Sequence, residues 1–307
     1  AAFEALGSEC SDLGFLFAAS AHLWGTVLPF ALHGSPEQRE RWLEGLVDGS
    51  TISAHAVTEP EAGSDVGSLR TRIQAVDGGD WLQIDGSKRY ITAAPLADLF
   101  VVYGRDDQGL RAVVVPADAP GLAVEDSPKM GLLGTPMGSV VFEACRVPAD
   151  HALGPVGAGL ALFQGALEWE RVGIVAPLLG AMQRQLDRSV AHARRRTQFG
   201  QPIGSFQAVS HRIADMKLRL DVGRLLVERA ARLKDEGLRA PVEAAEAKLW
   251  VTEAFLEGSI DAIRTQGAAG YLEDSPEARD LQDAAAGPLY SGTNDIQRNI
   301  IARFLGL

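Results

Sequence analysis

The chain has 307 residues, of which 46% are hydrophobic and 22% are charged, a mixture typical of a globular protein with ample material for a core. Its formal net charge of −11 argues against general binding of nucleic acids or of anionic membranes. We find no apolar run long enough to span a bilayer and no secretion signal, and two cysteines are too few for a disulfide framework or a thiolate metal site. These bounds favour a cytoplasmic enzyme, and they predict no metal site.

Residues 1–52 are predicted to form an N-terminal helical domain. The strongest start signal is Ser35-Pro36-Glu37-Gln38, with a serine at the N-cap, proline at the first helical position and glutamine three residues after the serine. The helix that follows is expected to end at Gly49. Because the chain begins in the middle of a helical pattern, we expect further helices before Ala1.

Residues 53–150 are predicted to form a small β-domain. Short apolar or alternating runs are separated by turns such as Asp77-Gly78-Gly79, and no helical pattern lies between them. This favours an antiparallel sheet over a parallel α/β sheet. The runs lie at 51–57, 69–76, 81–91, 99–103, 111–116 and 139–144.

Residues 151–307 are predicted to form a C-terminal four-helix bundle. Long amphipathic patterns with short connections are typical of antiparallel helices. Pro177 is expected to kink the first of them. The patterns cover 159–194, 205–236, 241–266 and 293–305. The fold class is therefore mainly α with an all-β insertion.

One stripe of the helix at 159–194 contains a single carboxylate. At 100° per residue this stripe comprises Phe163, Leu167, Glu170, Ile174, Leu178 and Ala181. Glu168 points away from the stripe, and Arg171 lies on its flank. An ionised carboxylate on an apolar face is costly unless it is paired or functional. The helix alone leaves two interpretations of Glu170 open, a structural carboxylate tied to an arginine and a catalytic base.

Four stretches, in this order along the chain, resemble the acyl-CoA dehydrogenase family. They are A-V-T-E-P-E-A-G-S-D (56–65), K-M-G-L-L-G-T (129–135), R-R-T-Q-F-G-Q-P-I-G-S-F-Q (195–207) and L-Y-S-G-T-N-D-I-Q-R-N-I-I-A-R (289–303). The resemblance covers essentially the whole chain and is more specific than any one motif. It implies a helical–β–helical subunit, bound FAD, and α,β-dehydrogenation of an acyl thioester. In the family a glutamate takes the α-proton and flavin N5 takes the β-hydride.

The resemblance implies that two β-domain segments contact the flavin ring. The turn that contains Val57, Thr58, Gly63 and Ser64 matches one side, with Ser64 also near the thioester. The segment Tyr90-Ile91-Thr92 matches the other side. Taken singly, Ser64 is explained as a turn residue and Tyr90 as a half-buried strand aromatic, but their joint spacing favours the flavin. An amide or hydroxyl here would stabilise charge as hydride arrives.

The resemblance also implies cofactor contacts made across a subunit interface. Arg196, Phe199 and Gln207 match contacts to the FAD pyrophosphate and adenosine, and an arginine fork suits diphosphate. Gly267 matches a glycine turn that reaches the same cofactor. Arg264 stands where the family has a glutamine, and it could supply that contact itself.

Thr293 and Asp295 are expected at the N-cap and first turn of the last helix. Free N–H groups there can meet a cofactor hydroxyl or phosphate. Capping alone would also explain both residues.

The chain departs from the family at its usual base. The common members have glutamate in a Y-E-G-T segment, whereas this chain has Tyr290-Ser291-Gly292-Thr293. A serine hydroxyl is far too weak a base near neutrality. Isovaleryl-type and long-chain-type members carry the glutamate on the long helix before an arginine, the position of Glu170-Arg171. The resemblance thus favours Glu170 as the base, with its pKa raised by burial.

The resemblance also implies a set of substrate-binding residues around this base. Its members are Ser64, Phe163, Leu167, Arg171, Tyr290, Ser291 and Gly292. The Y-S-G-T and E-W-E-R segments are similar to those of members in specialised biosynthetic pathways. There the acyl group is carried by an acyl-carrier protein in place of CoA.

The sequence therefore predicts an FAD-dependent acyl-thioester dehydrogenase. We expect a homo-oligomer, a dimer or a homotetramer, with FAD at the subunit interface, and electron-transfer flavoprotein or oxygen as the electron acceptor. Two alternatives stay open: a flavin-dependent oxidase or monooxygenase of the same fold, and a redox-silent homologue acting as a binding subunit.

Overall fold

The computed structural model describes residues 1–307, which form two compact units. One unit consists of Phe17–Lys129 and Thr135–Glu170 and contains the large sheet. The other consists of Ala1–Leu16, Met130–Gly134 and Arg171–Leu307 and is helical. The two units are defined by how densely their residues pack. They do not test the predicted division into three domains, which stays a prediction.

The N-terminal 50 residues are helical, as predicted. The helices are α1 (Ala2–Glu9), α2 (Leu13–His22), the π-helical η1 (Leu23–Val27), α3 (Leu28–His33), α4 (Pro36–Gln38), the π-helical η2 (Arg39–Leu43) and α5 (Glu44–Asp48). The predicted start signal is confirmed: the Ser35 hydroxyl accepts from the Gln38 N–H, and the Gln38 side chain accepts from the Ser35 N–H. Gly49 ends α5 in the left-handed conformation, with φ of 80°.

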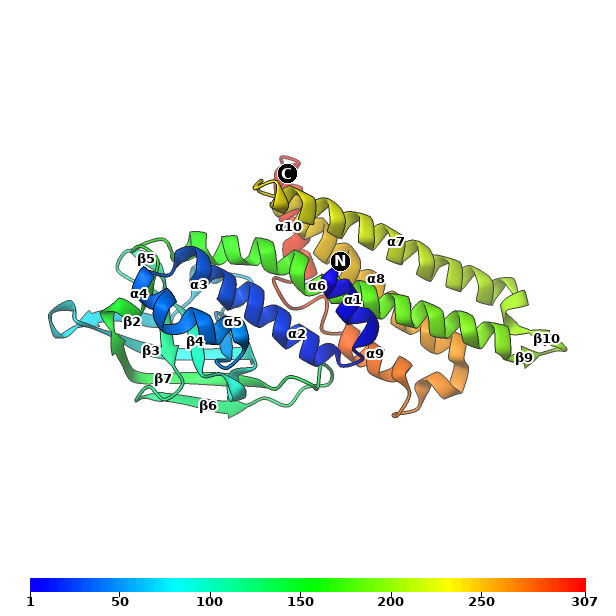
Figure 1. The fold of residues 1–307 in the computed structure, drawn as a ribbon, viewed down its shortest axis with the longest axis horizontal. Helices are drawn as coiled ribbons and strands as arrows, with labels where there is room; N and C mark the ends of the chain where they lie inside the picture. The colour runs from blue at the N-terminus through cyan, green and yellow to red at the C-terminus, as the bar shows by residue number, and fades with distance from the viewer. The chain divides into compact units, whose positions relative to one another are not determined.

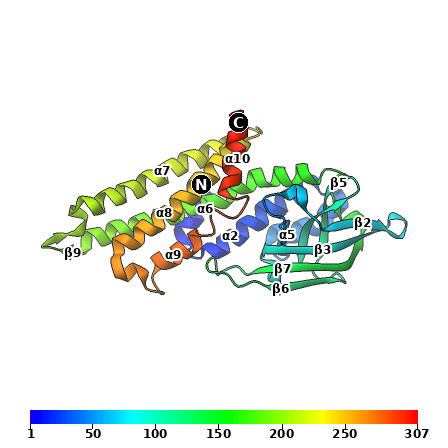
Figure 2. The same cartoon turned by 180° about the vertical axis from the view of Figure 1, so that it is seen from behind.

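An eight-stranded sheet follows (Figures 1 and 2). Its strands are β1 (Ser53–Ala56), β2 (Arg72–Val76), β3 (Trp81–Thr92), β4 (Leu99–Asp106), β5 (Gly109–Pro116), β6 (Leu122–Asp126), β7 (Met137–Pro148) and β8 (Ala152–Leu153). The order across the sheet is β6-β7-β3-β2-β4-β5-β8, and β1 pairs with β4. The sequence patterns did not reveal β6 or β8. Single 3₁₀ turns occur at Val66–Ser68, Asp77–Gly79, Ala94–Leu96 and Ala149–His151.

The sheet is mixed, which differs from the expectation of a purely antiparallel one. β1 and β2 both pair with β4 in parallel, while the other pairings are antiparallel. Alternation of apolar residues gives the face that each side chain takes but not the direction of a strand. A long segment and not a hairpin connects β1 to β4, so the connection allows the two strands to pair either in parallel or antiparallel.

The two faces of the sheet pack against different layers. Ile73, Ile84 and Phe100 belong to one apolar cluster, formed mainly by side chains of the strands. Val101, Tyr103 and residues of η1, α3, α5 and the start of α6 belong to the other. The second face therefore carries the helical layer in which the candidate base lies.

The helical unit is built around three long helices. Besides α1 and the start of α2, its elements are the second part of α6 (Gly159–Arg195), the hairpin β9 (Thr197–Gln198) and β10 (Gln201–Pro202), the 3₁₀ turn Ile203–Ser205, α7 (Gln207–Asp235), α8 (Pro241–Gln266), the 3₁₀ turn Gly267–Tyr271, α9 (Pro276–Ala284) and α10 (Asn294–Phe304). Side-chain hydrogen bonds join Gln183 of α6 to Arg224 of α7, and Gln185 of α6 to Ser259 of α8. The three helices run side by side in both views (Figures 1 and 2).

The four predicted helices of this region are present, and α9 is a fifth. The helix α6 continues through Pro177 over 37 residues. The sequence patterns missed α9, although Ser275-Pro276-Glu277 carries the same start signal as Ser35-Pro36-Glu37. In the structure the Ser275 hydroxyl caps α9 by accepting from the Ala278 N–H.

One segment corrects the statement that no apolar run could cross a membrane. The helical run Leu13–His33 is 21 residues long with a mean hydropathy of 1.5, which is enough by length and composition. Buried core helices of soluble proteins meet the same criteria, so a single such helix is weak evidence of a span. Here Ser20, Thr26 and Phe30 are almost fully buried within the protein.

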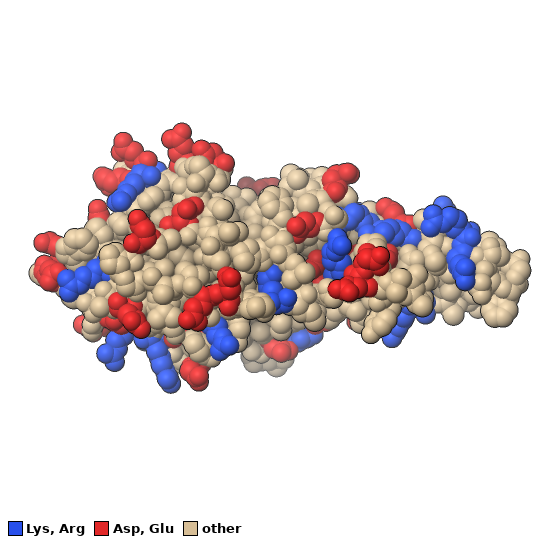
Figure 3. Space-filling view, turned by 90° about the horizontal axis from the view of Figure 1, so that it is seen from below, with Lys and Arg blue, Asp and Glu red and all other residues tan.

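Charged side chains of both signs are interspersed on the face shown in Figure 3. No continuous basic surface is visible there.

Candidate functional site

Glu170 lies in the first part of α6 and is a buried residue, 8% exposed. The ring of Trp169 is parallel to that of Trp24 of η1, with ring centroids 6.0 Å apart and an interplanar angle of 2°. A Cβ atom at Gly25 would lie 3.3 Å from His55 Nδ1 and 3.5 Å from Glu170 Oε2. The glycine therefore lets η1 approach the carboxylate closely. π-Helical turns are often found at functional sites.

Two polar aromatic side chains of the sheet lie beside this carboxylate. His55 of β1 places Nδ1 3.9 Å from Glu170 Oε2, which is longer than a hydrogen bond. Burial, aided by the charge of Lys88, lowers the pKa of His55 to about 4, so the imidazole is neutral near pH 7. Burial and the negative charge of Glu170 raise the pKa of Tyr103 of β4. Glu170 thus faces neutral groups and not a cationic histidine.

The same aromatic rings connect Glu170 to the start of α6. The rings of His55 and Tyr103 meet edge to face with centroids 5.1 Å apart. Phe163 closes the group, 5.6 Å from Tyr103 and 6.0 Å from His55. The predicted base and the predicted substrate-binding residue Phe163 are therefore brought to one aromatic cluster.

The turn predicted to contact the flavin is held by a buried ion pair. Lys88 of β3 is fully buried and donates to the Val57 carbonyl and to Glu59 Oε1, both at 2.8 Å. Glu59 also accepts from the backbone N–H groups of Arg70 and Thr71. Burial lowers the pKa of Lys88 to about 8, although the hydrogen bond and charge of Glu59 oppose this. The pair fixes both ends of the loop that contains Thr58, Gly63 and Ser64.

The segment at Tyr90 forms a bulge in β3. The register of β3 with β7 shifts between Lys88 and Ile91, and Tyr90 has φ of 60°. An aromatic residue in the left-handed region is strained, and such bulges re-aim side chains beside active sites. The Tyr90 side chain is 56% exposed, whereas Ile91 is buried. Next to the bulge the Arg89 N–H donates to the Thr58 carbonyl, which brings the two predicted flavin segments together.

In the helical unit, Arg171 holds the turn where the family's usual base would lie. Its Nε donates to the Ser291 carbonyl at 3.3 Å, and Gln297 Nε2 donates to the Gly292 carbonyl at 2.7 Å. Ser291 and Gly292 both have positive φ, 53° and 81°. The Thr293 hydroxyl then caps α10 by accepting from the Ile296 N–H.

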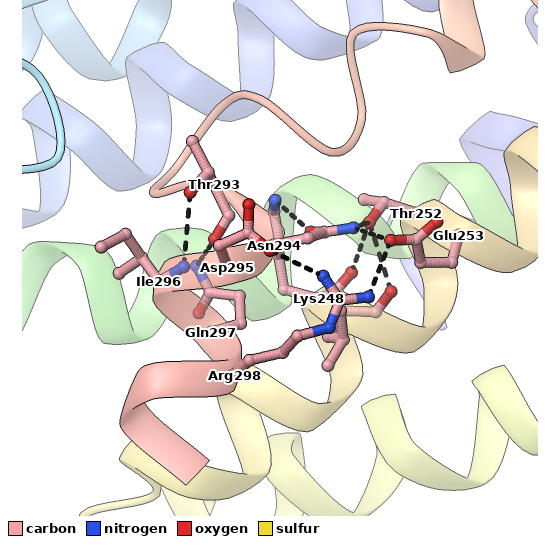
Figure 4. Close-up of polar contacts among 10 residues, drawn as sticks. Lys248, Thr252, Glu253, Thr293, Asn294, Asp295, Ile296, Gln297 and Arg298 are labelled. Atoms are coloured by element: carbon pink, nitrogen blue, oxygen red, sulfur yellow. Dashed lines mark hydrogen bonds and ion pairs between the residues drawn. The ribbon is translucent and has the colours of Figure 1, made fainter. Parts of the chain in front are cut away.

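A buried polar network supports this turn from α8 (Figure 4). Lys248 is fully buried and donates to Asn294 Oδ1 at 2.7 Å, and its Nζ lies 5.5 Å from the ring centroid of Tyr290. Asn294 in turn donates to Thr252 and to Glu253, which also pairs with Arg298. Burial, together with the charge of Arg171, lowers the pKa of Lys248 to about 7. Asp295 points to solvent and pairs with Arg298.

The remaining predicted cofactor residues are exposed at the surface of the helical unit. Phe199 is 92% exposed at the tip of the β9–β10 hairpin, where Phe199 and Gly200 both have positive φ. Arg196, Gln207 and Gly267 are exposed as well, and the Arg264 side chain is 64% exposed beside Asp261. Exposed arginines and a bare aromatic ring suit a cofactor shared with another subunit, as the resemblance implies.

Comparison with known proteins identifies the family. Residues 54–145 match the model of the acyl-CoA dehydrogenase middle domain, and residues 157–306 match that of the acyl-CoA dehydrogenase C-terminal domain. This chain belongs to the acyl-CoA dehydrogenase family. The prediction of the family and of its fold is thus confirmed. Acyl-CoA dehydrogenases are FAD-dependent oxidoreductases.

Three proteins similar to this chain bear on its substrate and cofactor. An L-prolyl-[peptidyl-carrier protein] dehydrogenase of Pseudomonas fluorescens is 41% identical, over 100% of this chain and 82% of the relative. The crystal structure of the prolyl acyl carrier protein oxidase AnaB has a TM-score of 0.97 and 40% identity, covering 100% of this chain and 82% of that one. The FAD complex of PigA has a TM-score of 0.96 and 39% identity, covering 99% and 81%.

The burial of Glu168 corrects the argument from helical phase. Glu168 was expected to point away from the buried stripe, but it is 3% exposed, less than Glu170 itself. Val172, Val175 and Leu179 are buried as well, so α6 is covered on more than one side. Helical phase separates one carboxylate from another only when one face of the helix meets solvent.

His55, Tyr103 and Lys88 are residues that the sequence patterns did not single out. Lys88 had a detectable signal, since it continues the inward alternation of Leu82 and Ile84 along β3. His55 and Tyr103 had no sequence signal of comparable strength. The period of a strand shows on which face of the sheet a side chain lies, but not which helix packs on that face. Their proximity to Glu170 depends on the pairing of β1 with β4 and on η1.

Proposed function

We propose that this protein catalyses FAD-dependent α,β-dehydrogenation of an acyl thioester, with Glu170 as the base. The observation that carries the proposal is the placement of Glu170: a buried carboxylate flanked by the Trp24–Trp169 stack, Gly25 and neutral aromatic groups. A carboxylate shielded from water is a stronger base than one in solution. The position of the family's usual base is Ser291, which cannot take its place.

Each residue has a separate role in the proposed reaction. Glu170 takes a proton from the α-carbon, and Phe163 and Leu167 on the same helix line the acyl group. FAD, when bound, supplies the two-electron acceptor for the hydride that leaves the β-carbon. The substrate thus loses one proton and one hydride, and a carbon–carbon double bond forms. Arg171 holds the Tyr290–Gly292 turn through the Ser291 carbonyl.

The residues present fit FAD. The strained bulge at Tyr90 presents an aromatic side chain next to the Val57–Ser64 turn, which suits a flat ring system. Arg196 and Arg264 are exposed donors suited to a diphosphate, and Phe199 suits an adenine. Thr293 and Asp295 at the start of α10 complete the proposed set, with Gln207 and Gly267.

We further propose that the acyl group is tethered to a carrier protein and not to CoA. The support is the naming of the relatives: the Pseudomonas fluorescens protein acts on an L-prolyl-[peptidyl-carrier protein] and AnaB on a prolyl acyl carrier protein. The enzyme is proposed to be a cytoplasmic homotetramer, and its two cysteines are free. Electron-transfer flavoprotein is the proposed electron acceptor.

An oxidase is the second candidate, because AnaB is described as an oxidase. It differs only in how the electrons leave, since oxygen then takes them directly. Consumption of oxygen in step with substrate during aerobic turnover distinguishes it from the dehydrogenase.

Anaerobic titration of the FAD-loaded protein tests the proposed function. Thioesters of pantetheine, CoA and a carrier protein are added, and bleaching of the oxidised flavin band is followed. We expect bleaching by a thioester with hydrogens on its α- and β-carbons. Loaded protein that no thioester bleaches would exclude the proposed reaction, and protein that cannot be loaded with FAD would indicate the redox-silent binding subunit.

A further inference from the structure

Two polar atoms beside Glu170 are buried without a hydrogen-bond partner in the chain. They are the hydroxyl of Tyr103, whose residue is fully buried, and Nε2 of His55, whose side chain is 12% exposed. Leaving such groups unsatisfied is costly, and phenylalanine or leucine would fill the same space without that cost. Tyr103 lies on a sheet face whose other members include Val101, Leu110 and Val114. A partner absent from the chain is therefore expected to bind these atoms.

The geometry places both groups at the candidate base. His55 Nδ1 is 3.9 Å from Glu170 Oε2, and the rings of His55 and Tyr103 are 5.1 Å apart. Phe163, which lies on the same helix as Glu170, contacts both rings. An acyl group whose α-carbon faces Glu170 would thus have its next atoms within reach of these two side chains.

Both groups are neutral near pH 7 and can each donate and accept a hydrogen bond. The imidazole stays unprotonated and the phenol stays protonated, because burial disfavours the charged form of each. Such a pair suits an N–H or O–H group on the acyl moiety. A plain hydrocarbon chain would leave both atoms unsatisfied, and sites of this kind reject analogues that lack the polar atom.

We propose that His55 and Tyr103 are specificity-determining residues that select acyl groups carrying an N–H or O–H next to the reacting carbons, such as a cyclic aminoacyl thioester. This inference rests on the proposed function and adds the substrate class to it. Glu170 remains the proton acceptor, and neither His55 nor Tyr103 takes part in proton transfer from the α-carbon.

Two matched probes test the inference: the pyrrolidine-2-carbonyl (prolyl) and cyclopentanecarbonyl thioesters of one pantetheine tether. They differ by an N–H in place of a CH₂. The FAD-loaded wild type and the variants Tyr103→Phe and His55→Leu are compared by the rate of anaerobic flavin bleaching. We expect each variant to lower the prolyl rate about tenfold or more relative to the cyclopentanecarbonyl rate. An equal fall with both probes, which a purely structural role would give, contradicts the inference, as does an unchanged ratio.

A binding measurement separates this inference from the proposed reaction. In the Glu170→Gln background, which removes the proposed base, the dissociation constants of both thioesters are measured by calorimetry with and without Tyr103→Phe. We expect the preference for the prolyl thioester to fall about tenfold with the second change. A wild type that neither probe bleaches would overturn the proposed function, and the binding ratio would still decide the role of Tyr103. The inference is wrong if that ratio does not move.

Discussion

Two glutamates lie two residues apart on α6, and both are buried. Glu168 is 3% exposed and Glu170 is 8% exposed. What distinguishes Glu170 is its neighbours: Gly25 of η1, and His55 of β1 at 3.9 Å. The proposal of Glu170 as the base therefore rests on the groups that surround this carboxylate and not on its burial alone.

Replacement of the base is the first prediction. Glu170→Gln should keep FAD and lose flavin reduction by the acyl thioester by a factor of about a thousand or more, because the amide cannot accept the α-proton. The rate of anaerobic bleaching measures this. The matched control is Glu168→Gln, which changes the other buried carboxylate of the same helix and should retain most of the rate. If the Glu170→Gln protein were reduced at the wild-type rate, another group would be the base.

The sequence led to the prediction of Glu170 as the base, but it did not point to the residues that surround Glu170 in the structure. The carboxylate is visible in helical phase, and Ser291 gave the chemical reason to choose it. His55 and Tyr103 come from β1 and β4, whose parallel pairing is not encoded in alternation. Their relation to Glu170 requires the packing of η1 and α6 on one sheet face, which is long-range information.

At the scale of elements, the pairing of β3 with β7 has two register shifts, one between Ile84 and Gly86 and one between Lys88 and Ile91. The first residues of β3 alternate with Leu82, Ile84 and Lys88 inward, and the bulge then turns Ile91 inward and Tyr90 outward. The buried Lys88–Glu59 pair lies immediately before the bulge. The pair therefore secures both the strand and the loop at the proposed flavin site.

Removing one partner of that pair is the second prediction. Glu59→Gln leaves the Lys88 ammonium buried without its carboxylate and should lower the free energy of unfolding by about 3–5 kcal/mol. Denaturant unfolding of the protein measures the change. As a control, Asp77→Asn breaks the Asp77–Arg146 pair, whose side chains are about half exposed, and should cost less than about 1 kcal/mol. Equal effects of the two variants would argue against the structural role of Lys88–Glu59.

The Lys248 network at the start of α10 leads to the third prediction, which concerns pH. The Lys248 pKa is lowered from 10.5 to about 7 by burial and by Arg171. Between these values the unfolded chain binds the proton and the folded protein does not, so the free energy of unfolding rises with pH, by at most about 1.4 kcal/mol per pH unit. The Lys248→Met variant has no group that titrates at this position, so its free energy of unfolding lacks this rise with pH.

Denaturant unfolding at pH 6, 7, 8 and 9 tests this prediction. The difference in free energy of unfolding between wild type and Lys248→Met should grow in favour of the wild type above pH 7. Lys217→Met serves as the control, because the Lys217 side chain is 53% exposed and pairs with Asp221 at the surface. A difference that stays constant from pH 6 to 9 would mean that Lys248 keeps its proton in the folded protein.

Elements were predicted with uneven success for physical reasons. The long helices of the C-terminal region appeared within two residues of their observed ends, because many periodic positions define them. Short elements lack that redundancy: β6, β8 and α9 were all missed. Only α9 had a usable local signal, the Ser275 cap followed by Pro276.

At the scale of the whole molecule, the proposed cofactor residues lie on exposed surface of the helical unit. Phe199 at the hairpin tip is almost fully exposed, and Arg196 is exposed beside it. An exposed aromatic ring next to an arginine leaves both side chains accessible to a ligand or to another chain. An active site assembled from two subunits would account for this exposure.

A mixing experiment with two inactive chains is the fourth prediction. Glu170→Gln and Arg196→Ala chains are co-expressed with different tags, and the hybrid oligomers are isolated. If Glu170 and Arg196 of one site come from different subunits, each hybrid two-chain unit has one intact site and one doubly altered site, so about half of the sites in the isolated hybrid units are intact. Turnover should then appear in the hybrids alone. Hybrids as inactive as the parent proteins would show that both residues of a site belong to the same chain.

The loop Met130–Gly134 has a consequence for the synthesis of the protein. Although it lies between strands β6 and β7 in the chain, it belongs to the helical unit, where the Leu132 N–H donates to Asp283, 151 residues later. A ribosome that adds roughly 5–20 residues per second needs on the order of ten seconds to make that intervening stretch. During this interval the loop can contact Asp12 and Gly14, which are made before it and lie against it in the folded protein, but its partner Asp283 is still missing. The nascent chain should therefore be most vulnerable to proteolysis at this loop until α9 emerges.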